Sequence, residues 1–420
     1  MDGFFTTLDS FNSAFDLLVG YWWIYIPLLL FFGLMGAYQN YTRTLYLAGI
    51  KWLILEIKVP KDPGRSPKGT EQIFIALHGI MPPPFKNWFI RWRETFWKGK
   101  VPDWFSFETV GIGGDIHFYV RMPEQYRKLV ESQIYAQYPD TELTEVEDYV
   151  RELPAGLPDV NNDLWGAEFI LNKPDSFPIK TYPEFEEKPG ALTDVKRIDP
   201  LSSLSEVLSS LDPGEYLGIQ LIIKPAGEDW IKKGQAEIDK ILGKTPKLQE
   251  DFLTTAIFEI DKYIPGYVEP KKDEKKDEKP QLTPGKTDIL KAIEHGFTKL
   301  GFQSSIRFLY AAPKERFHRP HISGVIGAYK QFSSPALNGF KLNGATMTIG
   351  KWPFKKQQEY GKKIRLLQKF RNRSFAPKSF VLNTEELATI FHFPDIGVKT
   401  PLLPRVEAKK GESPGGLPTG

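Results

Sequence analysis

One uncharged stretch near the N-terminus constrains this chain more than any other feature. Residues 17–38 read LLVGYWWIYIPLLLFFGLMGAY and contain no charged side chain. About 20 consecutive apolar residues are enough for a helix to cross the hydrocarbon core of a bilayer. Trp22 and Trp23 lie at one end, where amphipathic rings favour the level of the lipid headgroups. The sequence therefore predicts one transmembrane helix over residues 17–38, preceded by an extracytoplasmic segment, residues 1–16.

The charges on either side of this stretch predict its orientation. The first 20 residues carry three Asp and neither Lys nor Arg, whereas Arg43, Lys51 and Lys58 follow the stretch. Because basic flanks stay on the cytoplasmic side, we expect the N-terminus outside the membrane and the rest of the chain in the cytoplasm. A cleaved signal peptide fits less well, since the positively charged start and the small-residue cleavage site are both missing.

Composition limits the chemistry that the chain can perform. With 420 residues and 41% hydrophobic content, two or three domains with their own cores are expected. The formal net charge of +3 is close to balance, so the chain as a whole is not a polycation for nucleic acid. The absence of cysteine excludes disulfides, thiolate metal sites and a cysteine nucleophile.

Residues 51–148 predict a first cytoplasmic module. Apolar and polar residues alternate in 51–59, 104–112, 116–122 and 141–146, which is typical of strands, and helical spacing appears in 70–80 and after Pro123. Gly113-Gly114-Asp115 predicts a tight turn between two of the strands. The order β-α-β-β-α-β is the ferredoxin-like pattern.

An aromatic and basic insertion, residues 85–100, interrupts this module. Bulky rings recur at helical spacing in FKNWFIRWRETFWKGK, with Lys and Arg between them. Such a helix suits the membrane interface, and packing on the module's own sheet is an equally good interpretation. With the two tryptophans of the span, the candidate membrane-interface residues are Trp22, Trp23, Trp88, Trp92, Phe96 and Trp97.

Residues 160–394 predict a second ferredoxin-like module with long helical insertions. Strands are expected at 167–171, 216–224, 302–310 and 379–382, and helices at 201–211 and 320–332. The insertions include helices at 229–242 and 249–263 and a disordered charged loop, residues 271–280. Residues 395–420 predict a flexible tail. The fold class is therefore α+β, with one transmembrane helix and two ferredoxin-like modules.

A basic helix inside the second module is the clearest candidate for a contact. Residues 351–373 hold nine Lys or Arg against one Glu. A solvated helix face is the ordinary interpretation of such a run, but this excess favours an anionic ligand: lipid, nucleic acid or an acidic protein. The candidate residues are Lys355, Lys356, Lys362, Lys363, Arg365, Lys369, Arg371 and Arg373.

We find no catalytic constellation and expect no cofactor and no metal site. Gly285-Lys286-Thr287 resembles the end of a phosphate-binding loop, but Pro280 stands where that loop needs its first glycine. A catalytic cluster assembled from distant residues stays open as an alternative, because carboxylates are plentiful and spacing along the chain cannot exclude a spatial cluster.

Two segments resemble a known family. GGDIHFYVRMPEQYRKLVESQIYAQYPDTEL, residues 113–143, is similar to the N-terminal region of membrane-anchored DNA-transfer ATPases of type IV secretion and conjugation. SFVLNTEELATIFHFPDIGVKTPLLPRVEAKK, residues 379–410, is similar to the segment that leads into their motor domain. The chain looks like a bacterial membrane protein that carries this region without the motor's Walker motifs.

The resemblance implies a role beside such a motor rather than the motor's chemistry. We therefore expect a non-catalytic, single-pass protein of the bacterial cytoplasmic membrane. Its cytoplasmic part would dock a protein partner, for which the resemblance implies a separately encoded secretion-type ATPase. The alternatives are a membrane-tethered nucleic-acid-binding module that uses residues 355–373, and an enzyme of a type that the sequence does not reveal.

Overall fold

The computed structural model describes residues 20–59, 67–83, 87–153, 156–185, 199–243 and 282–394. The chain divides into two compact units, of which one contains Met1–Trp52 and Pro82–Asp103, and the other contains Leu53–Met81 and Trp104–Gly420. The predictions for residues 1–16, 249–263, 271–280 and 395–420 lie outside the described residues.

The first unit is built on one long helix, α2 (Trp22–Ala48). By length and hydropathy α2 is able to cross a membrane, and a signal sequence near an N-terminus meets the same criterion. α2 continues for ten residues beyond Tyr38, where the predicted span of residues 17–38 ends. The reason is that residues 39–48 contain no Gly or Pro, so the backbone stays helical until Gly49 after the apolar run has ended.

The aromatic insertion lies in the same unit as α2, not in the unit that contains the sheet. It forms α4 (Trp88–Trp92) followed by a π-helical turn, η2 (Arg93–Trp97). Tyr38 of α2 packs between Phe96 and Trp97, at ring centroid distances of 5.5 and 5.6 Å. The hydroxyl of Thr42 donates to the carbonyl of Phe96 at 3.2 Å. Within its own unit, the insertion therefore packs on α2.

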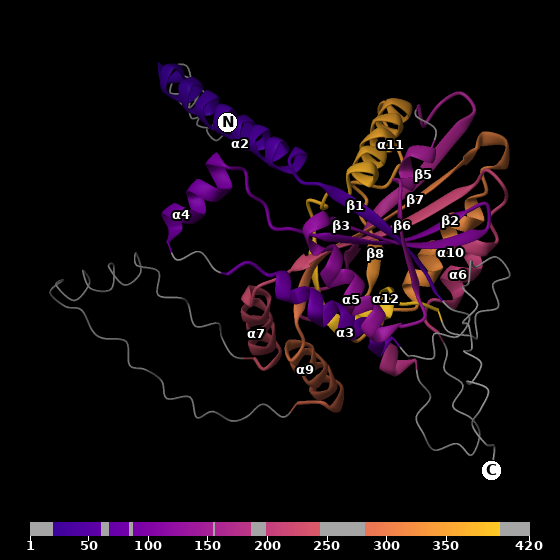
Figure 1. Ribbon diagram of the computed structural model, residues 1–420. Helices are drawn as coiled ribbons and strands as arrows, with labels where there is room; N and C mark the ends of the chain where they lie inside the picture. Colours follow the sequence, from indigo (N-terminus) through magenta and orange to yellow (C-terminus); the bar gives the residue numbers. More distant parts are fainter. Residues whose placement is uncertain are drawn as a thin grey trace, which may run out of the picture. The chain divides into compact units, whose positions relative to one another are not determined.

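The second unit is organised around one nine-stranded sheet (Figure 1). The main path runs β4-β1-β3-β2-β6-β7-β5-β8, and β9 pairs with β7. The strands in chain order are β1 (Trp52–Lys58), β2 (Phe105–Ile112), β3 (Asp115–Pro123), β4 (Glu142–Val146), β5 (Asn162–Leu171), β6 (Tyr216–Pro225), β7 (Gly301–Pro313), β8 (Phe340–Leu342) and β9 (Phe380–Asn383).

The strands expected to form two modules are joined edge to edge. β2 pairs antiparallel with β6 along the whole length of β2, with Phe105 opposite Ile223 and Ile112 opposite Tyr216. The strand predictions are confirmed apart from their ends, and β8 is an addition. The predicted turn at Gly113-Gly114 joins β2 to β3, and both glycines take positive φ, 57° and 98°. The protein is thus α+β, with a long apolar N-terminal helix and a continuous antiparallel sheet.

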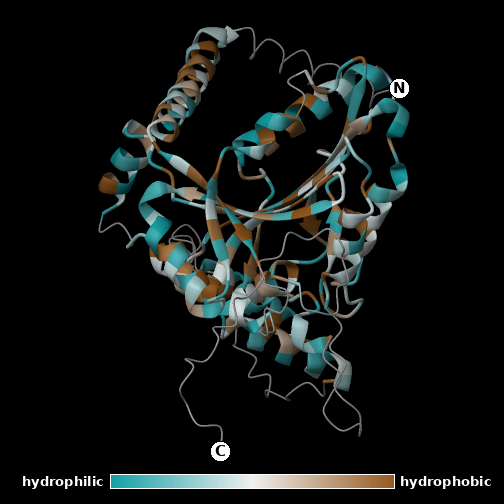
Figure 2. Cartoon of the chain, turned by 45° about the vertical axis from the view of Figure 1, so that its right-hand side comes forward, coloured by the Kyte–Doolittle hydropathy of each residue, from teal (hydrophilic) through white to brown (hydrophobic). Residues whose placement is uncertain are grey.

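Helices cover the two faces of the sheet unequally. Figure 2 shows α11 on one face and the other helices of this unit on the opposite side. The larger core lies on that opposite side, beneath α3 (Lys68–Leu77), α5 (Arg127–Gln137), α6 (Ser202–Ser209), α10 (Arg319–Lys330) and α12 (Thr384–Ile390). α11 (Lys355–Asn372) contributes Leu367 and Phe370 to a smaller core on the other face.

Two further helices pair away from the main core. α7 (Asp229–Ile241) and α9 (Pro284–Phe297) bury Ile238, Leu290 and Ile293 against one another. Gly285-Lys286-Thr287 lies in the first turns of α9. Short helical turns occur at η1 (His78–Ile80), η3 (Glu124–Tyr126), η4 (Tyr149–Glu152), η5 (Tyr182–Glu184) and η6 (Lys314–Arg316).

Candidate functional site

α11 lies very close to the sheet because glycines stand beneath it. A Cβ added at Gly166 of β5 would come within 2.3 Å of the carbonyl oxygen of Phe308 and 2.7 Å of the Leu366 side chain. A Cβ added at Gly218 of β6 would come within 2.6 Å of the Phe370 ring. Only glycine leaves this space, so the two positions let the basic helix settle onto the strands.

A row of polar side chains crosses the sheet under the C-terminal end of α11. Neighbouring strands place its members in register: Tyr119 on β3 opposite Glu108 on β2, then Gln220 on β6, Arg307 on β7 and Glu168 on β5. The last four are fully buried. Polar groups in such a place need partners, since an unpaired buried polar group costs roughly 1–3 kcal/mol.

Two members of the row bind the last carbonyls of α11. Gln220 donates to the carbonyl of Phe370 at 2.9 Å, and Arg307 donates to the carbonyls of Lys369 and Ser374. Burial lowers the pKa of Arg307 to about 10, which leaves it charged at neutral pH. A cation and an amide thus satisfy carbonyls that a helix end leaves without partners, and the positive charge suits the negative end of the helix dipole.

Arg373, directly after α11, closes the same network. It is completely buried and takes a positive φ of 47°. Its Nε lies 3.0 Å from a carboxylate oxygen of Glu108, and its Nη1 lies 2.6 Å from one of Asp148. Burial by itself lowers the pKa of this guanidinium, but the two carboxylates outweigh burial and hold the pKa above its usual value. Tyr149 also donates to Glu108.

The structure therefore uses three of the eight predicted anion-contact residues inside the fold. Besides Arg373, Lys363 lies 2.7 Å from Asp163 and 2.8 Å from Glu359, and Lys369 lies 3.1 Å from Glu168. Apart from Glu359, these partners lie about two hundred residues away in the sequence. Spacing within the helix gives no signal for such pairs, so the sequence could not separate internal cations from surface cations.

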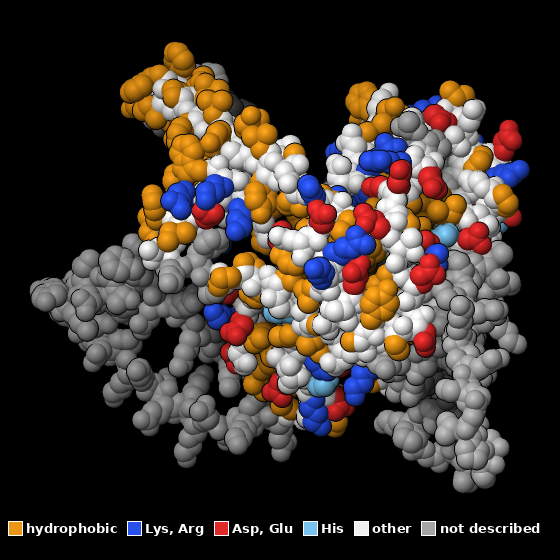
Figure 3. Space-filling view, in the orientation of Figure 1, with side chains coloured by type: hydrophobic (Ala, Val, Ile, Leu, Met, Phe, Trp, Pro, Cys, Tyr) orange, Lys and Arg blue, Asp and Glu red, His pale blue; other side chains and the backbone are white. Residues whose placement is uncertain are grey.

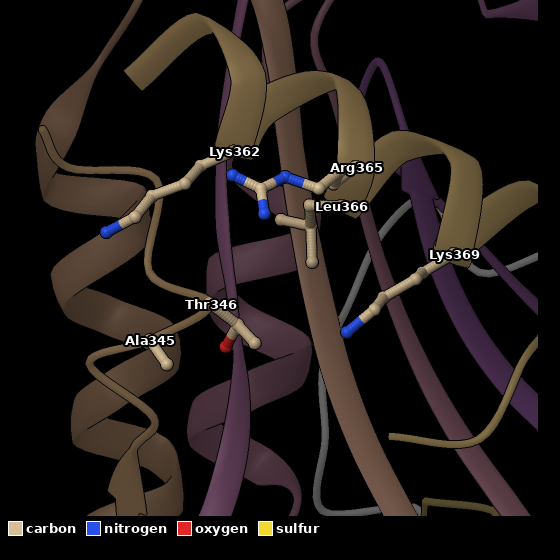
Figure 4. A pocket seen from close by; sticks show the side chains of 6 residues that line it. All are labelled: Ala345, Thr346, Lys362, Arg365, Leu366 and Lys369. Atoms are coloured by element: carbon tan, nitrogen blue, oxygen red, sulfur yellow. The ribbon is translucent and has the colours of Figure 1, made fainter. Parts of the chain in front are cut away.

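The remaining cations of α11 face outward or line a hollow. Lys355, Lys356 and Arg365 are exposed, and Lys362 and Arg371 are half-buried. Figure 4 shows Lys362, Arg365 and Lys369 on successive turns, above a loop that carries Ala345 and Thr346. With Leu366 these residues line a hollow of about 60 Å³.

Lys369 is already paired with Glu168, so Lys362 and Arg365 are the cations of this hollow that favour a small anionic group. Lys362 Nζ donates to the carbonyl of Ile349 at 2.9 Å, and Arg365 Nε donates to the carbonyl of Gly361 at 3.0 Å. These bonds hold both side chains near the rim while leaving other donors of each group for a ligand. Carboxylates and phosphates are the anions that such donors recognise.

A larger pocket, of about 260 Å³, lies between η5, α9 and α12. It contains Glu385, which accepts from the Thr181 hydroxyl at 2.7 Å and lies 3.2 Å from His295 and 3.3 Å from Lys299. Burial raises the pKa of Glu385, but the bonds from Thr181 and His295 outweigh it, and the pKa lies below its usual value. Sequence reasoning missed this cluster because its residues come from distant segments.

The membrane-interface candidates all belong to the first unit. Their exposure is 58% for Trp22, 60% for Trp23, 78% for Trp88, 36% for Trp92 and 54% for Trp97. Phe96 is half-buried, because it stacks on Trp92 and packs on Tyr38. Large rings exposed to this degree are typical of surfaces that meet lipid or another protein.

Comparison with known proteins identifies the family to which the chain belongs. No curated protein matches the sequence. A family described as a domain of unknown function, DUF8128, matches residues 70–403. The matched region contains most of the sheet, α11 with its cationic hollow, and the pocket around Glu385. Since the match covers well over half of the sequence, the chain belongs to the DUF8128 family.

Proposed function

We propose that this chain is a non-catalytic, single-pass membrane protein whose sheet unit is a cytoplasmic docking platform. The observation that supports anchoring most directly is α2, a 27-residue apolar helix whose 18-residue core has no buried side chain. Transfer of an exposed apolar helix of this length from water into a bilayer lowers its free energy. The flanking charges support an orientation with the N-terminus outside, which we propose for a bacterial cytoplasmic membrane.

The docking surface in this proposal is the cationic hollow of α11. Lys362 and Arg365 present positive charge beside Thr346, and we propose that an acidic side chain of a partner enters the hollow. The partner we propose is a separately encoded DNA-transfer ATPase, on the strength of the resemblance in residues 113–143 and 379–410. Charge pairs of this kind steer association and fix register more than they add affinity.

The strand order supports a finer proposal for the fold. β4-β1-β3-β2 and β8-β5-β7-β6 follow the same sequence of positions outward from the β2–β6 junction. We propose that each half is a ferredoxin-like unit and that the two halves pair through their equivalent strands. Such a continuous sheet is a wide, rigid support for a docking helix.

Nucleic acid is a second candidate ligand because the hollow also suits a phosphate. The two candidates differ in their response to salt and nuclease. Binding to phosphates weakens steeply as salt rises, in proportion to the number of contacts. A protein partner held by shape as well as charge is less sensitive to salt and insensitive to nuclease.

The test is co-purification of the full chain. A C-terminally tagged protein is extracted gently from membranes of its own host, with and without nuclease, and retained proteins are identified by mass spectrometry. We expect an ATPase of the transfer class to be retained after nuclease treatment. Lys362→Glu with Arg365→Glu should abolish its retention.

The matched control is Lys232→Glu with Lys233→Glu, which changes the same charge on exposed positions of α7. If both double variants lost retention, the change in net charge alone would explain the loss, and docking at α11 would be contradicted. Partners that disappear with nuclease would favour nucleic acid. A chain purified alone under all conditions would reject the platform.

A further inference from the structure

The loop before α11 carries an unusual group of exposed rings. Trp352 is 91% exposed and Phe354 is 70% exposed, and Ile349 and Tyr360 nearby are 43% and 55% exposed. Folded proteins rarely leave a tryptophan this free of contacts. We define residues 349–356 as the α11 tip. In Figure 3, orange apolar side chains stand at the upper end of α11, with blue basic side chains below them.

The charges of the tip all have one sign. Lys351, Lys355 and Lys356 are exposed, and no ion pair of theirs is present among the described residues. No Asp or Glu occurs between residues 343 and 358. Rings and ammonium groups therefore alternate in the tip, and the next acidic residue along the chain, Glu359, pairs with Lys363 instead. This composition differs from the hollow farther along α11, whose Lys369 is paired with Glu168.

The tip is held in a defined conformation. Gln358 accepts from the backbone N–H of Lys351 at 3.1 Å, and its amide donates to the carbonyl of Pro353 at 2.8 Å. A Cβ at Gly350 would come within 1.9 Å of the carbonyl oxygen of Lys355, so the loop folds tightly onto the start of the helix. The rings thus protrude from a fixed backbone, so that burying them costs side-chain ordering but little backbone ordering.

We propose that the α11 tip inserts into the interfacial region of an anionic membrane. Tryptophan and phenylalanine favour the headgroup boundary, and neighbouring lysines keep their ammonium groups at the level of the phosphates. A bilayer accepts protruding rings without a complementary slot, which suits side chains that stand free of the fold. A nucleic acid would instead need a groove or platform in which bases stack.

This inference rests on the membrane anchoring proposed above, but not on docking of a protein partner. The tip would give the chain a second lipid contact besides α2. It separates two roles along one helix: residues 349–356 for lipid, and Lys362 and Arg365 for the partner. Anionic lipid and α2 would then act together, since the second contact forms at the high effective concentration set by the first.

The absence of cysteine makes a direct test available. Ile349→Cys is labelled with an environment-sensitive fluorophore, which leaves both rings of the tip intact. The full chain is reconstituted in phosphatidylcholine vesicles with and without phosphatidylglycerol, and quenching by doxyl-labelled lipid is measured. Val160→Cys, at an 86% exposed position of the sheet unit, is the matched control. Protease protection in the same vesicles reports α2 insertion separately.

We expect the probe at position 349, but not that at 160, to be quenched when phosphatidylglycerol is present. Changing Lys351, Lys355 and Lys356 to Glu should weaken the tip contact by roughly fivefold or more for each lysine, given the strength of one charge at an anionic surface. Trp352→Ala with Phe354→Ala should abolish quenching while leaving α2 inserted.

Three results would overturn the inference. One is an inserted chain whose probe at 349 is not quenched in anionic vesicles. Another is equal quenching at 349 and 160, which would mean unspecific collapse onto the surface. The third is a probe that responds to a single-stranded oligonucleotide in detergent but not to doxyl lipid, which would assign the tip to nucleic acid.

Discussion

Arg365 in α11 and Arg373 directly after it show that one residue type can have two different roles. Arg373 has no exposed surface and binds Glu108 and Asp148, whereas Arg365 is exposed at the rim of the hollow. The first guanidinium stabilises the fold by compensating the buried carboxylate of Glu108 and the half-buried carboxylate of Asp148. The second is free for a ligand. At the residue scale, burial rather than residue type decides which arginine is structural.

Arg373→Met should destabilise the protein strongly. Removing the guanidinium leaves Glu108 and Asp148 without their counter-charge, and breaking a buried ion pair costs about 3–5 kcal/mol. The free energy of unfolding, measured in urea, should fall by that amount. Arg365→Met is the control and should change it by less than about 0.5 kcal/mol, the usual range for exposed sites. Equal effects would show that Arg373 contributes no more than a surface arginine.

The pair of Glu56 and His117 gives a prediction in pH. Their atoms lie 2.7 Å apart, and the hydrogen bond from His117 lowers the pKa of Glu56 below its ordinary value. A depressed folded-state pKa contributes stability that is present above the ordinary pKa of 4.5 and is lost as the pH falls through the folded-state pKa. Acidification below about pH 4.5 should therefore lower the unfolding free energy of the wild type more than that of His117→Ala.

The measurement is urea unfolding of both proteins at pH values from 7 down to 3. The difference in unfolding free energy should be about 1 kcal/mol near neutrality, as for a partly exposed charge-assisted bond, and should shrink in acid. His318→Ala removes an exposed histidine and serves as the control. A difference that stays constant down to pH 3 would contradict the assignment.

At the scale of elements, the position of α11 depends on two glycines in strands. Gly166 and Gly218 leave room for Leu366 and Phe370, and polar groups of the sheet bind the last carbonyls of the helix. Neither feature belongs to α11 itself. The strands beneath α11 therefore determine its position, and this position decides which of its charged side chains are exposed.

Gly218→Val should displace α11. The new side chain would meet the Phe370 ring and the Tyr216 hydroxyl, both closer than 3 Å to its Cβ, and overpacking of this kind costs about 1–3 kcal/mol or more. We expect a lower unfolding free energy and faster amide exchange in 355–372, measured by mass spectrometry. Gly327→Val is a control, since a Cβ there meets nothing within 4 Å. Unchanged exchange in α11 would contradict the close approach.

At the scale of the whole sheet unit, β2 and β6 make one structure from two halves. The pairing buries polar and apolar side chains on both faces across the junction, and both cores extend over strands of the two halves. Backbone pairing along a full strand couples the halves more tightly than a contact of side chains between separate domains would. The two halves should therefore unfold together.

This coupling predicts one cooperative transition. Phe118→Ala in the first half and Phe308→Ala in the second each remove a buried ring, at a cost of about 3–5 kcal/mol. Fluorophores on single cysteines in the two halves should report the same midpoint in each variant. A probe that keeps its wild-type midpoint while the other shifts would show that the halves unfold independently.

The sequence by itself determined the local structure. Alternating apolar residues predicted the strands, Gly113-Gly114 predicted their turn, and the run of uncharged residues predicted a helix able to span a membrane. These predictions succeed because the causes are local: backbone conformation and the periodicity of apolar side chains. The predicted span and α2 end at different residues, because the apolar run ends before the helical backbone does.

Only the tertiary structure decided what the charged residues do. Glu108, Gln220, Arg307 and Glu168 are isolated polar residues in apolar strands, and alternation places them on the face opposite the larger core, where water is the expected neighbour. α11 covers that face, so the same residues become a buried network. The cations in and after α11 divide into internal and external groups for the same reason. The carboxylates that hold Lys363, Lys369 and Arg373 across the fold lie two hundred or more residues away, and only folding brings them within bonding distance.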